Sequence, residues 1–184
     1  MTMRRTFFVI FFAVIAATPV IADLVGGKAY ALKMVDVDGR ALSTADGHVT
    51  VLVLARRAEV DKARLVGDRV PERCLGNPAY RMITVIRFNR NWGRSMRFFS
   101  TSLIRRRLDA EARRLKPKYQ AKQLTRNPRQ DVYAVADFDG ANASQLGLVN
   151  DSTPFLVLIF AGNGTLLKDW TDVPSAEELA TTLP

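Results

Sequence analysis

Short apolar runs alternate along this chain with stretches whose apolar residues recur at helical spacing, and this alternation restricts the fold more than any other feature. The apolar run at residues 51–54 leads into residues 58–70, where Val60, Ala63 and Val66 form a stripe. A further apolar run follows at residues 82–88. Strand, helix and strand in this order predict a right-handed βαβ unit within an α/β fold.

The remaining segments extend the same pattern. Apolar residues at three- and four-residue steps predict a long helix from about Ser100, capped by Ser100, Thr101 or Ser102 and ended or kinked by Pro117. The runs on either side of Ala-Gly-Asn-Gly predict a closing antiparallel hairpin. Ser175 and Glu178 form a capping box before a last helix. Other predicted elements are strands at 30–37 and 131–138 and a short helix at 141–148.

The first 22 residues have the plan of a secretory signal peptide. Arg4 and Arg5 supply the charge, residues 6–17 the apolar run, and Val20 and Ala22 the small residues before cleavage. We therefore expect residues 23–184 to form one domain in the periplasm or outside the cell. The alternative is an uncleaved anchor in the inner membrane.

The ordered set of segments resembles the thioredoxin-like superfamily, in its redoxin or alkyl-hydroperoxide-reductase-like branch. The resemblance covers residues 32–183 and includes VDVDGRAL before the first buried strand. In the second half it includes VADFDG, a short helix, Thr-Pro before a strand, and the Gly-Asn-Gly hairpin. The resemblance implies a three-layer α/β fold with a central mixed sheet flanked by helices.

The chain departs from this family where thioredoxins hold Cys-x-x-Cys, at the start of the first helix. A helix N-terminus lowers the pKa of a thiol, but residues 55–61 here read ARRAEVD and contain none. The peroxidatic Thr-x-x-Cys pattern is also absent. Arg56 and Arg57 either form a cationic binding rim at this position or are solvated charges paired with Glu59 or Asp61.

By the same resemblance, Thr153–Pro154 corresponds to the cis-proline bond that the family places beside the first helix. A cis bond at this point presents backbone groups to an extended partner. The alternative is an ordinary trans proline that opens an edge strand. Thr153 and Pro154 are thus candidate binding residues together with Arg56 and Arg57.

Cys74 is the only cysteine and follows the first predicted helix. One cysteine forms no disulfide within its own chain, and the dipole that activates thiols acts at the other helix end. We expect an inert buried thiol, while a reactive one remains the alternative, since Arg73 next to it lowers the thiol pKa. His48 is the only histidine, so no four-ligand metal site of nitrogen and sulfur can form, and we expect no metal or cofactor.

A strongly basic block lies in the middle of the chain. From Arg81 to Arg129 there are 15 Lys or Arg residues and two acids, Asp109 and Glu111. Within the long helix, four-residue spacing predicts ion pairs of Asp109 with Arg105 and Arg113, and of Glu111 with Arg107. The helix then keeps an excess of positive charge, which includes Arg105, Arg106 and Arg107.

This excess predicts a docking surface for an acidic protein or an anionic lipid surface, with peripheral membrane contact aided by the neighbouring Trp92, Phe98 and Phe99. Export argues against nucleic acid as a partner. The alternative is a solvated face without a partner.

Together these features predict an exported, redox-inactive thioredoxin-like protein that acts as a binding or scaffold module for a protein or an anionic partner. The alternative is a single-thiol oxidoreductase of the redoxin or peroxidase type, with Cys74 as its catalytic residue.

Overall fold

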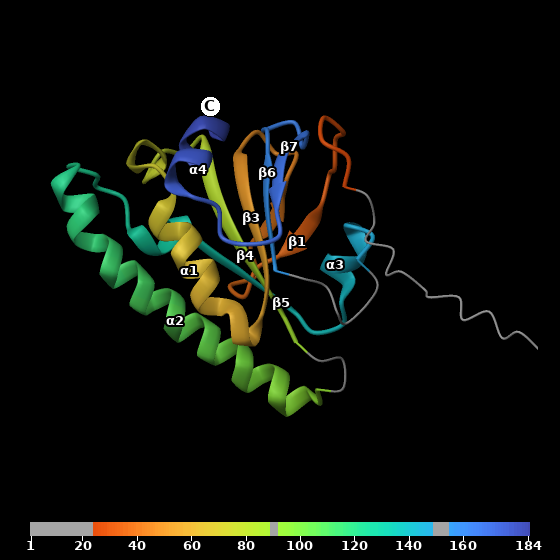
Figure 1. Ribbon diagram of the computed structural model, residues 1–184. Coiled ribbons are helices and arrows are strands. Elements are labelled where there is room, and N and C mark those ends of the chain that lie inside the picture. Colours follow the sequence, from red (N-terminus) through yellow and green to blue (C-terminus); the bar gives the residue numbers. More distant parts are fainter. Residues whose placement is uncertain (1–23, 89–91, 149–154) are drawn as a thin grey trace, which may run out of the picture.

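A mixed five-stranded sheet is the centre of the computed structural model, which describes residues 24–88, 92–148 and 155–184 (Figure 1). The strand order is β5-β4-β3-β6-β7. The first three strands in this order are parallel to one another, and β6 and β7 are antiparallel, as the sequence predicts. The strands are β3 (Val49–Arg56), β4 (Tyr80–Arg87), β5 (Val132–Asp137), β6 (Leu156–Phe160) and β7 (Leu166–Trp170).

The predicted strand over residues 30–37 is shorter than expected. Only β1 (Lys33–Val35) forms, and it pairs with β2 (Ala41–Ser43) in a separate two-stranded sheet. The chain leaves the strand because Asp36 forms the turn, where its carboxylate accepts hydrogen bonds from the Asp38 and Arg40 amides at 2.9 and 2.7 Å. A local turn here overrides the apolar pattern.

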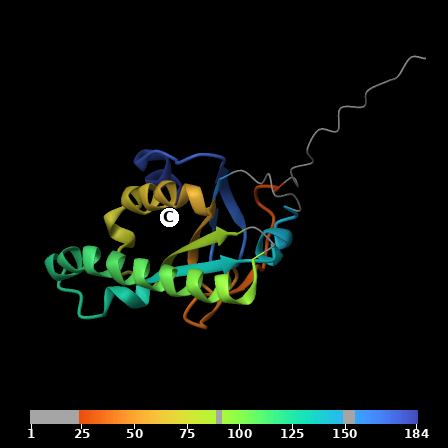
Figure 2. The same cartoon turned by 90° about the horizontal axis from the view of Figure 1, so that it is seen from below.

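Helices cover both faces of the sheet (Figures 1 and 2). The helices α1 (Val60–Arg69), α2 (Arg94–Ala121) and α4 (Ala176–Thr182) lie on one face. The β1–β2 pair and α3 (Ala141–Gln145) lie on the other. The 3-10 turns η1 (Arg57–Glu59), η2 (Glu72–Cys74) and η3 (Pro128–Asp131) complete the described elements. The observed layers are those of the predicted α/β fold.

The long helix α2 begins six residues before the predicted start and passes through Pro117. Gly93 precedes it, and no side chain caps it, so the prediction of a cap at Ser100, Thr101 or Ser102 is wrong. The helix continues past Pro117 because its buried stripe does: Tyr119 is fully buried and its hydroxyl donates to Asp131 at 2.5 Å. Packing thus outweighs the missing amide donor of one proline.

Candidate functional site

The start of α1 holds an ion pair and no thiol. The Arg56 guanidinium lies 2.9 Å from Glu59 Oε1, and Glu59 Oε2 accepts the Arg56 backbone amide at 3.1 Å. The hydrogen bond and charge of Arg56 lower the pKa of Glu59, and Glu59 raises that of Arg56. Much of the positive charge expected here is therefore balanced within one turn.

Arg57 points to a different neighbour, since its guanidinium carbon lies 5.8 Å from the centre of the Trp92 indole ring. Thr153 and Pro154, the other candidate residues, lie outside the described part of the chain. In the described part of the chain that follows them, Leu156 on β6 lies opposite Leu54 on β3 in the sheet. A binding rim of Arg56, Arg57 and Thr153–Pro154 therefore stays a prediction.

Cys74 lies in η2, beyond the opposite end of α1 from Arg56. It is 8% exposed and packs in a cluster with Val51, Val66 and Leu183. Burial raises the pKa of its thiol, although Arg73 and Lys122 act in the other direction. These properties are typical of a packed cysteine and differ from those of an activated thiolate.

A cavity of about 590 Å³ lies between α1, α2 and the sheet. Its floor is β4, where Met82 and Thr84 are only half-buried although this strand lies inside the sheet. Apolar side chains of both helices form the walls, among them Val60, Ile104 and Leu108. The volume is within the range of small-molecule sites, and so is the mainly apolar lining.

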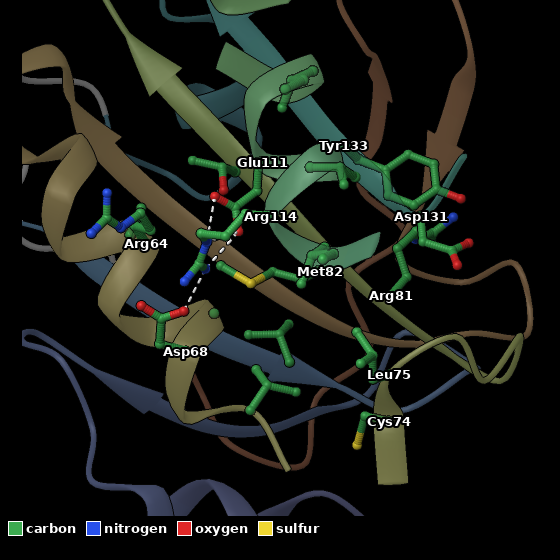
Figure 3. Close-up of a pocket in the computed structure, with 18 of the residues that line it drawn as sticks. Arg64, Asp68, Cys74, Leu75, Arg81, Met82, Glu111, Arg114, Asp131 and Tyr133 are labelled. Carbon is green, nitrogen blue, oxygen red and sulfur yellow. Dashed lines mark hydrogen bonds and ion pairs between the residues drawn. The ribbon is translucent and has the colours of Figure 1, made fainter. Parts of the chain in front are cut away.

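Charged side chains surround the mouth of this cavity. The Arg114 guanidinium on α2 lies 2.5 Å from Asp68 on α1 and 2.6 Å from Glu111 on its own helix, so an ionic bridge crosses between the two walls (Figure 3). Arg64 and Arg107 also line the cavity, from α1 and α2 respectively, and neither forms an ion pair with a described residue. The apolar space is therefore bordered by two uncompensated cations.

Cys74 and the Tyr119–Asp131 pair lie at the other end of the same cavity. Burial and the hydrogen bond to Asp131 raise the pKa of Tyr119, so this phenol is a neutral donor near neutral pH. Within the described residues, no group of three or more His, Cys, Asp or Glu is placed to hold a metal ion.

The basic trio of α2 does not form one surface, because successive residues on a helix point about 100° apart. Arg105 turns inward, donates to the Val37 carbonyl at 2.8 Å and lies 3.5 Å from Asp38. Arg107 borders the cavity, and Arg106 is exposed.

The predicted pairs at four-residue spacing are wrong among the described residues. Asp109 pairs with Arg129 from η3 at 2.8 Å, and Glu111 pairs with Arg114. Arg105 pairs with Asp38, while Arg107 and Arg113 have no ion-pair partner among the described residues. Partners that are distant in the sequence replace the expected ones.

The cavity itself has no signature that the sequence alone would reveal. Two small or polar residues on its surface are the nearest to a signal: Gly67 in the last turn of α1 and Thr84 among the apolar residues of β4. A Cβ at Gly67 would lie 3.4 Å from Met82 Sδ, so α1 approaches the floor closely at this point.

Comparison with known proteins gives structural neighbours only. No family model matches the sequence, and no curated protein matches it. A DsbF homologue from Corynebacterium diphtheriae superposes with a TM-score of 0.50 and 12% identity, over 84% of this chain and 83% of that one.

Two structures from Bacteroides thetaiotaomicron are similar as well. The C-terminal domain of a protein assigned as a thiol-disulfide oxidoreductase has a TM-score of 0.51 at 11% identity, over 86% of this chain and 93% of its own. A solution structure assigned as a protein disulfide isomerase has a TM-score of 0.52 at 10% identity, over 85% of both chains. At these identities the similarity concerns the fold.

Proposed function

The chain has a thioredoxin-like fold, and we propose that it is an exported binding protein that performs no thiol–disulfide exchange. One observation carries the proposal: the start of α1 holds the Arg56–Glu59 ion pair, and the only thiol, Cys74, is buried beyond the other end of the helix. Exchange of a disulfide requires an accessible thiolate. In this proposal the fold serves to position a ligand-binding site.

We assign the binding role to the cavity between α1 and α2. Its floor of Met82 and Thr84 accepts an apolar group without any rearrangement of the core, because these side chains are already half-exposed. Arg64 and Arg107 at the border supply positive charge without an ion-pair partner among the described residues. The ligand that fits both features is a small amphiphile with an apolar body and an anionic head group.

A fluorescent fatty acid, dansyl-undecanoate, tests this assignment directly. We expect saturable binding that falls about tenfold or more in Thr84→Leu, because the larger side chain occupies the floor. Arg64→Gln and Arg107→Gln should weaken binding of the acid but spare its methyl ester, since only the acid carries the charge.

Lys33→Gln is the control, because Lys33 is exposed and does not line this cavity. Binding that survives Thr84→Leu unchanged, in a variant whose circular dichroism and unfolding midpoint match those of the wild type, would remove the cavity from the proposal.

The alternative function, a single-thiol oxidoreductase, has one observation in its favour: Cys74 lines the same cavity. The labelling rate of Cys74 with a maleimide separates the two functions. We expect slower labelling in the folded chain than in denaturant, because the thiol is buried and its pKa is raised. Faster labelling in the folded chain would favour the enzyme.

A further inference from the structure

The first ten residues of α2 expose an unusual amount of apolar surface. Phe98 and Phe99 are each 68% exposed, and their rings meet edge to face with centres 6.1 Å apart. Met96 is 49% exposed and Leu103 44%. These four side chains are half of the large apolar residues that stand exposed in the described part of the chain. An apolar cluster of this kind on a surface indicates an interaction site.

The fold itself does not use this surface. The buried side of α2 is the stripe of Ile104, Leu108, Ala112 and Tyr119, which packs on β5 and η3. Helix periodicity places Met96, Phe99 and Leu103 on the opposite side. In both views α2 forms an outer edge of the molecule, so this side faces away from the sheet (Figures 1 and 2).

Cationic residues follow the exposed apolar residues along the same side of α2. Along α2 the exposed residues at three- and four-residue steps are Met96, Phe99, Leu103, Arg106, Ala110 and Arg113. Residues 94–108 contain no acid. Neither Arg106 nor Arg113 forms an ion pair with a described residue. The amphipathic surface is therefore apolar and cationic, without compensating carboxylates of its own.

We propose that this surface, made of Met96, Phe98, Phe99 and Leu103 with Arg106 and Arg113, docks the protein on an anionic lipid bilayer. The phenylalanines would enter the headgroup region, and the arginines would contact lipid phosphates. A bilayer fits because exposed apolar and cationic side chains lie together on one helix, with no acid within residues 94–108. No helix in the described ranges has the length and hydropathy to cross a membrane.

Vesicles that contain phosphatidylglycerol test the docking surface in the full chain. A fluorophore on Ser95→Cys, in a Cys74→Ser background, reports contact at α2 itself and so separates it from any contact made by the leader. We expect a blue shift on phosphatidylglycerol vesicles, weak response to phosphatidylcholine, and a decline as salt rises. Phe98→Ser with Phe99→Ser should reduce the vesicle affinity about tenfold or more.

Matched controls test whether vesicle binding depends on this surface or on exposed apolar groups and net positive charge anywhere on the protein. Val35→Ser and Leu167→Ser remove exposed apolar groups elsewhere, and we expect no change in affinity. The double change of Arg106 and Arg113 to Gln should weaken binding strongly. The same charge removed as Lys33→Gln and Lys168→Gln should weaken it much less.

Two results overturn the proposal. One is equal loss of affinity in the two variants that remove charge. The other is retention on an immobilised acidic polypeptide through the same residues, with no response to vesicles, which would identify an acidic protein as the partner.

Discussion

The two faces of the sheet are filled very differently. On the face covered by the β1–β2 pair and α3, the β4 side chains Ile83 and Val85 are 0% and 1% exposed. On the opposite face of the same strand, Met82 and Thr84 are only half-buried. A closed face supplies stability, and an open face supplies room for a ligand.

The cause lies in the helices of the open face. The helix α1 packs on β3 and β4 through Ala63 and Val66, and α2 packs on β5, so the slot above β4 stays unfilled. Across the slot, Arg114 and Asp68 form an ion pair where apolar residues would otherwise meet. On the closed face, residues of the β1–β2 pair and α3 pack with the strands in one buried cluster.

The largest expected difference between the faces is in how much stability is lost when a single β4 side chain is truncated to alanine. Ile83→Ala should lower the free energy of unfolding by about 2–5 kcal/mol, because it leaves a void in a closed core. Met82→Ala should lower it by less than half as much, since this side chain is partly exposed. Urea unfolding of both variants measures the contrast, and equal losses would mean that the open face is closed in solution.

A partly buried ion pair on the closed face should give the next largest effect. Arg81 on β4 is buried, and its guanidinium lies 2.8 Å from Asp46. Partial burial raises the pKa of Asp46, but hydrogen bonds from Arg81 and His48 outweigh it and hold this pKa at about 2. Asp46→Asn should therefore cost about 1–2 kcal/mol at neutral pH, allowing for the partial exposure of the carboxylate.

The pH dependence of this effect follows from the lowered pKa. The unfolded chain protonates Asp46 near pH 3.9, so the contribution is complete above about pH 4 and is lost as the pH falls through about 2. Unfolding curves of wild type and Asp46→Asn between pH 7 and pH 2 should converge at the acid end. A difference at pH 2 as large as that at pH 7 would show that the carboxylate charge is not its source.

The smallest effect should come from the bridge across the open face. Arg114→Gln and Asp68→Asn should each change the free energy of unfolding by less than about 1 kcal/mol, because both groups are partly solvated. A double-mutant cycle in low and high salt measures the coupling, which salt should reduce. A coupling as large as the Asp46 effect would place this bridge in a buried environment and contradict an open face.

Much of the fold was predictable because its signals are local. Strand β4, the hairpin of β6 and β7, and the Ser175–Glu178 capping box lie where the apolar period and the turn residues place them. The course of α2 through Pro117 was not predictable, because it depends on a buried stripe that continues to Tyr119 and on the hydrogen bond of Tyr119 to Asp131 in η3.

The site divides in the same way. The absence of a thiol at the start of α1 can be read from residues 55–61, because the sequence alone decides which atoms are present. The roles of the three consecutive arginines at residues 105–107 cannot be read from the sequence. Arg105 turns to Val37 and Asp38, more than sixty residues away, while Arg107 borders the cavity and Arg106 stays exposed.

The sequence by itself therefore determined the order of the elements, the excess of positive charge and the loss of the dithiol. Only the tertiary structure decided where α1 and α2 lie on the sheet, and with them the cavity and the amphipathic surface of α2. The physical reason is that local periodicity specifies which side of an element is apolar. The space between two elements depends on which partners, far apart in the chain, each side meets.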